Sequence, residues 1–182
     1  MNTFLTILFI IIFIILILLI TYIIFYNKIN DTIIRINEAE NRIDNNLRDK
    51  YDVLNRSVTL IKSRIKLKDD AFKELQKLKS RKISNFELDR ILVTSHNEFI
   101  SIYEKNKELR DSDEIYKAAK QLELIDEELV TLRNYYNGNI ASYNKMIKKF
   151  PTLIIAKIKK YNEKLFYDLK NQSDEDYEDF KL

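Results

Sequence analysis

Residues 118–150 read AAKQLELIDEELVTLRNYYNGNIASYNKMIKKF and carry the most regular hydrophobic pattern of the chain. Apolar residues recur there at steps of four and three with one extra four, at Ala118, Leu122, Ile125, Leu129, Leu132, Tyr136, Ile140, Tyr143, Ile147 and Phe150. This spacing makes one stripe on an α-helix and cannot alternate across a strand. It predicts a long amphipathic helix that stops at Pro151. Gly138, at the extra four, predicts a close backbone approach or a local break, with a tolerated surface glycine as the alternative.

The same periodicity extends upstream and predicts two further helices. The first carries a stripe that continues toward Ser80, at Ile29, Ile33, Ile36, Ala39, Ile43, Leu47, Tyr51, Leu54, Val58, Ile61, Ile65, Phe72, Leu75 and Leu78. A second helix begins at the capping box Ser84-Asn85-Phe86-Glu87, with its own stripe at Leu88, Leu92, Ser95, Phe99, Ile102 and Leu109. Acids and cap formers at residues 111–114 open the helix described above.

The segment after Pro151 completes the expected fold. Apolar residues between Leu153 and Leu169 predict a shorter fourth helix, and the short connections predict antiparallel neighbours. We therefore expect an all-α protein in which a transmembrane helix precedes a long antiparallel four-helix bundle over residues 28–170, running up, down, up and down. Residues 171–182 are acidic, and we expect a disordered tail there.

The composition excludes most other fold and site classes. One Gly and one Pro in 182 residues leave too little turn chemistry for β-sandwiches, barrels and α/β folds. Zero Cys excludes disulfides, thiolate zinc sites, iron–sulfur clusters and a Cys nucleophile. A net charge of +3, from 31 basic and 28 acidic residues, does not indicate a general polyanion binder.

The N-terminal segment predicts a membrane anchor. Residues 4–25 are Ile, Leu and Phe interrupted by Thr6, Thr21 and Tyr22, with no ionisable group from Asn2 to Asn27. About 22 helical residues cross a hydrocarbon core of about 30 Å. Because a basic n-region and a small-residue cleavage site are missing, we expect an uncleaved single-pass anchor at residues 1–27.

The charges that flank the anchor bear on its orientation. Lys28, Arg35 and Arg42 follow the anchor and no Lys or Arg precedes it. This asymmetry favours a cytoplasmic C-terminal domain.

The search for catalytic chemistry predicts no enzyme. His96 is the one histidine, so di-iron and zinc-protease patterns fail, and a single glycine is too few for a phosphate-binding loop. Neither a cofactor nor a metal is therefore expected. We interpret His96 as a partly exposed helix residue and residues 126–128, Asp-Glu-Glu, as a solvated face.

Two basic clusters allow a binding role, although nucleic acid is not expected as a partner. Basic residues between Lys62 and Lys82 surround an apolar stripe, which favours a solvated helix end over polyanion or anionic-lipid binding. Lysines between Lys145 and Lys164 could form a membrane-surface helix. In an up-down-up-down path, however, the turn at Pro151 lies far from the bilayer, so burial in the bundle is preferred.

Two Tyr-Asn pairs lie seven residues apart, at Tyr136-Asn137 and Tyr143-Asn144, and therefore face the same way. Buried Asn can fix the register of packed helices. A structural role is the preferred interpretation, and a polar patch that binds a small ligand is the alternative.

Residues 132–156, LRNYYNGNIASYNKMIKKFPTLIIA, resemble the signature of the LemA family. That signature has an Arg, a Tyr-Asn, a second Tyr-Asn seven residues later, and Phe-Pro before an apolar Ile-Ala. Residues 41–44, 49–54 and 122–128 resemble other segments of the family. The resemblance implies a bacterial, single-pass, membrane-attached helical bundle with no established catalytic activity. The residues that carry it are Arg133, Tyr136, Asn137, Tyr143, Asn144, Phe150 and Pro151.

Together these patterns predict a membrane-anchored, non-catalytic interaction or scaffold protein in a bacterial cell membrane. Its expected partners are the lipid bilayer and an unidentified protein, with homo-oligomerisation left open. The alternatives are a small-ligand bundle that uses the Tyr-Asn patch, and polyanion or anionic-lipid binding by residues 62–82.

Overall fold

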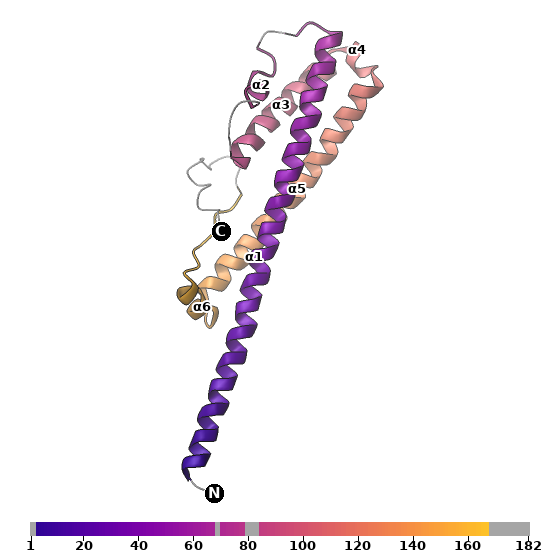
Figure 1. The fold of residues 1–182 in the computed structure, drawn as a ribbon. Helices are drawn as coiled ribbons and strands as arrows, with labels where there is room; N and C mark the ends of the chain where they lie inside the picture. Colours follow the sequence, from indigo (N-terminus) through magenta and orange to yellow (C-terminus); the bar gives the residue numbers. More distant parts are fainter. Residues whose placement is uncertain (1–2, 68–69, 79–83, 168–182) are drawn as a thin grey trace. The chain divides into compact units, whose positions relative to one another are not determined.

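The computed structural model describes residues 3–67, 70–78 and 84–167, and within these ranges every regular element is a helix (Figure 1). The helices are α1 (Thr3–Arg64), α2 (Lys73–Lys77), α3 (Asn85–Lys105), α4 (Lys107–Arg110), α5 (Asp113–Lys148) and α6 (Thr152–Lys159). The prediction of an all-α helical bundle is confirmed. The acidic tail at 171–182 and the basic residues Lys68, Lys79, Arg81 and Lys82 lie outside the described residues.

Helix α1 joins the apolar N-terminal segment to the bundle stripe without a break. Among the described helices it is the one whose length and composition suit a membrane span, and none of its apolar window is buried by protein. The helix ends at Arg64 instead of continuing toward Ser80. Phe72 prevents a helix from continuing to Ser80. Its backbone is left-handed, with φ of 57°, and its side chain is buried. Its amide donates to the Glu98 carboxylate at 3.1 and 3.2 Å. An aromatic side chain in this conformation cannot continue an α-helix.

The described chain divides into two compact units, and α1 and α5 each contribute to both. One unit combines residues up to Asn37 with Gly138–Phe166, and we call it the anchor unit. The other combines Glu38–Asn137 with Tyr167, and we call it the bundle unit.

Ion pairs give the helix directions in the bundle unit. Helix α1 runs antiparallel to α5, because Arg42 pairs with Glu128 and Arg64 with Glu114. Helix α3 is also antiparallel to α5, because Asp89 pairs with Arg133 and His96 with Asp126. Helices α1 and α3 therefore run in the same direction, and the predicted up-down-up-down path is wrong. The chain returns through the link at residues 65–84, in which α2 is the one described helix.

The predicted stripes supply the core of the bundle unit. Ser84 caps α3 as expected, because its hydroxyl accepts a hydrogen bond from the Glu87 amide. The fully buried apolar residues of α1, α3 and α5 in this unit include Ala39, Ile43, Leu47, Leu54, Ile61, Leu92, Phe99, Ile115, Leu122 and Leu129. Their spacing by fours and threes is the pattern that predicted the helices.

In the anchor unit the last helix is shorter than predicted. Helix α6 ends at Lys160, whose φ is 55°, and the Tyr161 amide donates to the Ala156 carbonyl in a Schellman-type termination. Residues 161–167 have no helical structure, although a helix was expected as far as Leu169. The side chains that compete with helix formation here are described below.

Gly138 lies within α5 and does not interrupt it. A methyl group built at this position would meet nothing within 4 Å. Neither the expected close approach nor the expected break is present, so Gly138 is a tolerated glycine on an exposed helix face.

Candidate functional site: a groove between α3 and α5 and the polar clusters of the bundle unit

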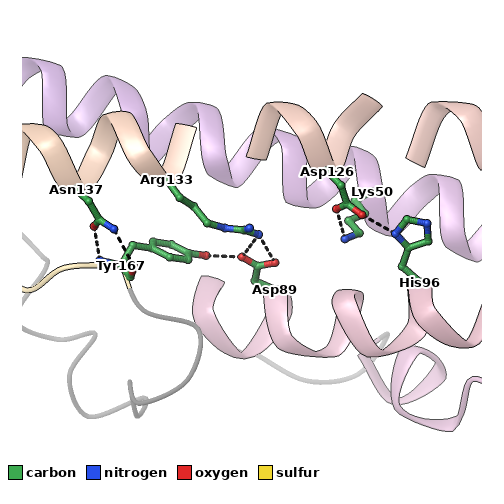
Figure 2. Close-up of polar contacts among 7 residues, drawn as sticks. All are labelled: Lys50, Asp89, His96, Asp126, Arg133, Asn137 and Tyr167. Atoms are coloured by element: carbon green, nitrogen blue, oxygen red, sulfur yellow. Dashed lines mark hydrogen bonds and ion pairs between the residues drawn. The ribbon is translucent and has the colours of Figure 1, made fainter. Parts of the chain in front are cut away.

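Three helices of the bundle unit bring Lys50, His96 and Asp126 together (Figure 2). Lys50 of α1 is fully buried, and its Nζ donates to Oδ1 of Asp126 on α5. His96 of α3 places Nδ1 2.5 Å from Oδ2 of the same carboxylate. Asp126, predicted on a solvated face, has 35% of its side chain exposed and pairs with both neighbours, while His96 is partly exposed as predicted, with 13% of its side chain exposed.

The charge state of Asp126 fixes the roles of its partners. Burial by itself would raise the pKa of Asp126, but hydrogen bonds from His96 and Lys50 outweigh it and hold the pKa below its ordinary value. Asp126 is thus a carboxylate at neutral pH, and His96 Nδ1 is the donor. In the neutral ring Nε2 is then an acceptor. That Nε2 is buried and has no hydrogen-bond partner among the described residues.

A groove of about 550 Å³ opens next to His96 and Asp126. Its walls are Ile100 and Tyr103 from α3, and Tyr116, Ala119 and Val130 from α5. Tyr116 is 56% exposed and Val130 is 54% exposed, so the walls present apolar and aromatic surface to solvent.

The rim of the groove carries more acid than base. Lys120, Glu123 and Glu127 line it together with Asp126, and Lys120 pairs with Glu123 at 2.6 Å. Because Lys50 pairs with Asp126 and Lys120 with Glu123, Glu127 leaves the groove with hydrophobic walls and a modest excess of negative charge. Such a surface favours an occupant that is apolar and positively charged.

A second cluster joins α3, α5 and Tyr167 (Figure 2). Asp89 is fully buried and accepts from Arg133 Nη2 at 2.7 and 2.5 Å and from the Tyr167 hydroxyl at 3.0 Å. The Arg133 guanidinium also lies 5.8 Å from the centre of the Tyr167 ring. Burial, followed by the charge of Asp89, raises the pKa of Tyr167 far above its ordinary value, so the hydroxyl stays protonated and donates.

The two predicted asparagines clamp the extended segment that follows α6. In the bundle unit, Asn137 Nδ2 donates to the Tyr167 carbonyl at 3.1 Å, and its Oδ1 accepts from the Tyr167 amide at 2.7 Å. In the anchor unit, Asn144 makes the same pair of bonds with Lys164, at 2.8 and 2.9 Å. Each side-chain amide therefore satisfies both backbone groups of one residue.

The two clamps explain why the chain does not stay helical after α6. Hydrogen bonds to these asparagines replace those that a longer α6 would have made.

The remaining predicted residues have different environments. Tyr136 and Tyr143 are each 2% exposed, and burial raises the pKa of Tyr143 to about 12. Phe150 is 80% exposed, and Pro151 lies in the turn between α5 and α6. The predicted residues are thus mostly structural, and the amides of the Tyr-Asn pairs already bind the chain's own backbone.

Sequence analysis missed Lys50, Asp89, His96, Asp126 and Tyr167. A signal was present for four of them, because they stand at four-and-three spacing among apolar residues. Lys50 follows Leu47 and precedes Leu54, Asp89 precedes Leu92, His96 precedes Phe99, and Asp126 precedes Leu129. A polar residue in an apolar register is expected to be buried with a partner. Tyr167 carried no comparable signal, since its role depends on the end of α6, which the apolar pattern up to Leu169 did not predict.

Two further site classes can be compared with the structure. Among residues 3–67, 70–78 and 84–167, no group of three or more His, Asp or Glu side chains is placed to hold a metal ion. Of the basic cluster at 62–82, Lys62, Lys66, Lys73 and Lys77 are exposed, and Arg64 pairs with Glu114.

The comparisons with known proteins give one match. The model of the LemA family matches residues 39–178, which is more than half of the chain. No curated protein and no solved structure matches.

Proposed function

Since this chain belongs to the LemA family and begins with a helix suited to span a membrane, we propose that it is a membrane-anchored, non-catalytic scaffold. In this proposal the groove between α3 and α5 holds a basic, amphipathic segment of a partner protein. The observation that carries it is the exposed wall of Tyr116 and Val130 above a carboxylate-rich rim. A hollowed apolar surface that is exposed on a monomer usually marks a binding site.

The polar clusters support a structural rather than a catalytic use of the bundle unit. Both oxygens of Asp126 are engaged, by Lys50 and His96, and Asp89 is fully buried against Arg133 and Tyr167. The buried Nε2 of His96 does not reach solvent. A general acid or base has to reach a substrate proton, and these groups instead hold helices together.

The proposed location is a bacterial cell membrane with the bundle unit in the cytoplasm. Lys28 and Arg35 follow the spanning segment on α1, and positive flanks stay on the cytoplasmic side. Because the chain has no cysteine, Asn134→Cys on an exposed face of α5 gives a single label site. Labelling of intact cells by a membrane-impermeant maleimide would refute this orientation.

The groove is tested by site-specific photo-crosslinking in native membranes. A photoreactive amino acid replaces Val130 in the groove or, as the matched control, Leu124 on the same helix outside it. The two aliphatic residues are 54% and 55% exposed, so they differ in location rather than in accessibility. We expect a discrete protein adduct from position 130 that position 124 does not give.

A charge variant tests whether that adduct reflects the proposed recognition. Glu127→Lys reverses one charge at the rim, and it should weaken the adduct at position 130 if the partner segment is basic. An adduct of equal yield from both positions, or one that Glu127→Lys leaves unchanged, contradicts the groove assignment. An adduct with a second copy of the chain would identify the protein as its own partner.

A further inference from the structure

Helix α6 lies beside the end of the membrane-spanning segment within the anchor unit (Figure 1). Lys159 places Nζ 5.4 Å from the centre of the Tyr26 ring, and the Tyr161 hydroxyl donates to Asn30 Oδ1 at 3.3 Å. Tyr26 directly follows Phe25, the last residue of the apolar run. Helix α6 is therefore held at the level where α1 passes from hydrocarbon to headgroups.

This position corrects the expectation that the turn at Pro151 lies far from the bilayer. That expectation depended on an up-down-up-down path. The contacts of Lys159 and Tyr161 with residues 26 and 30 instead place the segment after Pro151 at the membrane end of α1.

Helix α6 has a second apolar face that the protein does not cover. Thr152, Ile155 and Ala156 are buried on one side of the helix. Ile154 and Ile158 are four residues apart, share the opposite side, and are 51% and 65% exposed. One apolar side of this eight-residue helix packs on the protein, so the other apolar side is left for a further contact.

The turn before α6 and the segment after it extend this surface. Phe150 precedes the helix and is 80% exposed, while Leu165 and Phe166 follow it and are 40% and 48% exposed. Exposed aromatic and aliphatic side chains thus flank the helix in the same unit that contains the spanning segment.

The charges around the apolar face are almost all positive. From Gly138 to Phe166 the chain has seven lysines and a single acid, Glu163, which pairs with Lys148 at 2.6 Å. At 100° per residue, Lys157 and Lys159 project on either side of Ile158, and all three are exposed. Lysines that flank an apolar stripe are typical of helices lying in an anionic membrane surface, where the side chains extend to the phosphates.

We propose that α6 and its flanking residues form a contact site for anionic phospholipids in the leaflet where α1 leaves the membrane. Ile154 and Ile158 enter the boundary between headgroups and acyl chains. The side chains of Lys157 and Lys160 bind the phosphate groups of these lipids. Two observations select lipid as the occupant: the attachment of α6 to the end of the spanning segment, and the excess of positive charge.

The test uses the full-length chain reconstituted in liposomes with a fluorophore on a single cysteine, since the natural sequence has none. Ile158→Cys places the environment-sensitive label on α6. Ile34→Cys is the matched control, because Ile34 is 53% exposed in the same unit and lies eight residues, or about 12 Å, beyond Tyr26 along α1. Each protein is measured in phosphatidylcholine alone and in a mixture with phosphatidylglycerol, with and without doxyl-labelled acyl chains.

We expect the label at position 158 to be blue-shifted and quenched by the doxyl lipids in the phosphatidylglycerol mixture, and to lose much of that quenching in phosphatidylcholine alone. The label at position 34 should show neither effect. Adding Lys157→Gln and Lys160→Gln to Ile158→Cys should reduce the quenching in the anionic mixture toward the value in phosphatidylcholine. Because these lysines are exposed, the two substitutions should not disturb folding.

Equal quenching of the position 158 label in the two lipids would overturn the assignment to anionic headgroups. Quenching no greater than at position 34 would overturn the membrane contact itself. A blue shift without doxyl quenching would also overturn it, because the label would then be covered by protein. None of these results depends on the groove between α3 and α5, so this proposal and the proposed function fail separately.

Discussion

Replacing Asp89 by Asn is expected to destabilise the bundle unit strongly, because it removes one charge from a buried pair. The substitution keeps the shape of the side chain and an oxygen that can accept from the Tyr167 hydroxyl. It removes the counter-charge of Arg133, whose side chain is 15% exposed. Leaving one partner of a buried ion pair uncompensated costs about 3–5 kcal/mol.

The size of the effect sets the assay. At about 2–4 °C per kcal/mol for a chain of this length, the midpoint of thermal unfolding should fall by about 6–20 °C. The full-length protein is heated in detergent micelles and followed by near-ultraviolet circular dichroism of its 11 tyrosines, since this signal reports tertiary packing. Glu123→Gln is the control, because its pair with Lys120 is exposed on both sides in the middle of α5 and the midpoint should not change.

A second substitution separates the loss of charge balance from a loss of packing. In Asp89→Asn with Arg133→Met, the unpaired guanidinium is gone, so the double variant should be more stable than Asp89→Asn alone. A midpoint for Asp89→Asn within about 2 °C of the parent would refute the reasoning, since Arg133 would then have access to solvent. A double variant less stable than Asp89→Asn would refute it as well.

Three further predictions address other parts of the bundle. Asn137→Ala leaves both backbone groups of the clamped segment unpaired and should lower the free energy of unfolding by about 1–3 kcal/mol in urea titrations, whereas Asn134→Ala, exposed on the same helix, should not. Gly138→Ala should raise the free energy of unfolding by about 0.5–1 kcal/mol, because the methyl group meets nothing and alanine restricts the unfolded chain; a loss of stability would show a contact absent from this structure. The folded-state pKa of Asp126 lies below its ordinary value of 3.8, so its contribution is present above pH 3.8 and is lost as the pH falls through the folded pKa. Asp126→Asn should therefore flatten the decline of the unfolding free energy in that acid range, and an unchanged slope would contradict the shift.

The helices could be predicted from the sequence because hydrophobic periodicity and capping are local properties. The stripe from Ile43 to Ile61, apart from the half-buried Tyr51, and that from Leu122 to Tyr136 are buried where the pattern placed them. The capping hydroxyl of Ser84 accepts from the Glu87 amide that its spacing indicated. The apolar run of α1 likewise identified a helix suited to span a membrane without reference to any other segment.

The candidate site was less predictable, because its residues come from distant parts of the chain. Lys50 and Asp126 are 76 residues apart, and Asp89 and Arg133 are 44 apart. Periodicity indicates which face of each helix is buried, but not which helix covers it. The position of these polar residues in an apolar register therefore indicated that they are buried, but not which residues they pair with.

The sequence by itself determined that this protein is helical, where α3, α5 and α6 begin, and which segment suits a membrane span, because each depends on neighbours within a few residues. Tertiary structure alone decided that α3 runs parallel to α1, since the helical spacing of Phe72, Leu75 and Leu78 predicted a continuing helix that the left-handed Phe72 and its bond to Glu98 interrupt. It also decided that residues 161–167 are not helical, because Asn137 and Asn144 on α5 satisfy the backbone of Tyr167 and Lys164. Hydrogen bonds between segments far apart in sequence compete there with local helix bonds, and only the folded arrangement determines which of them form.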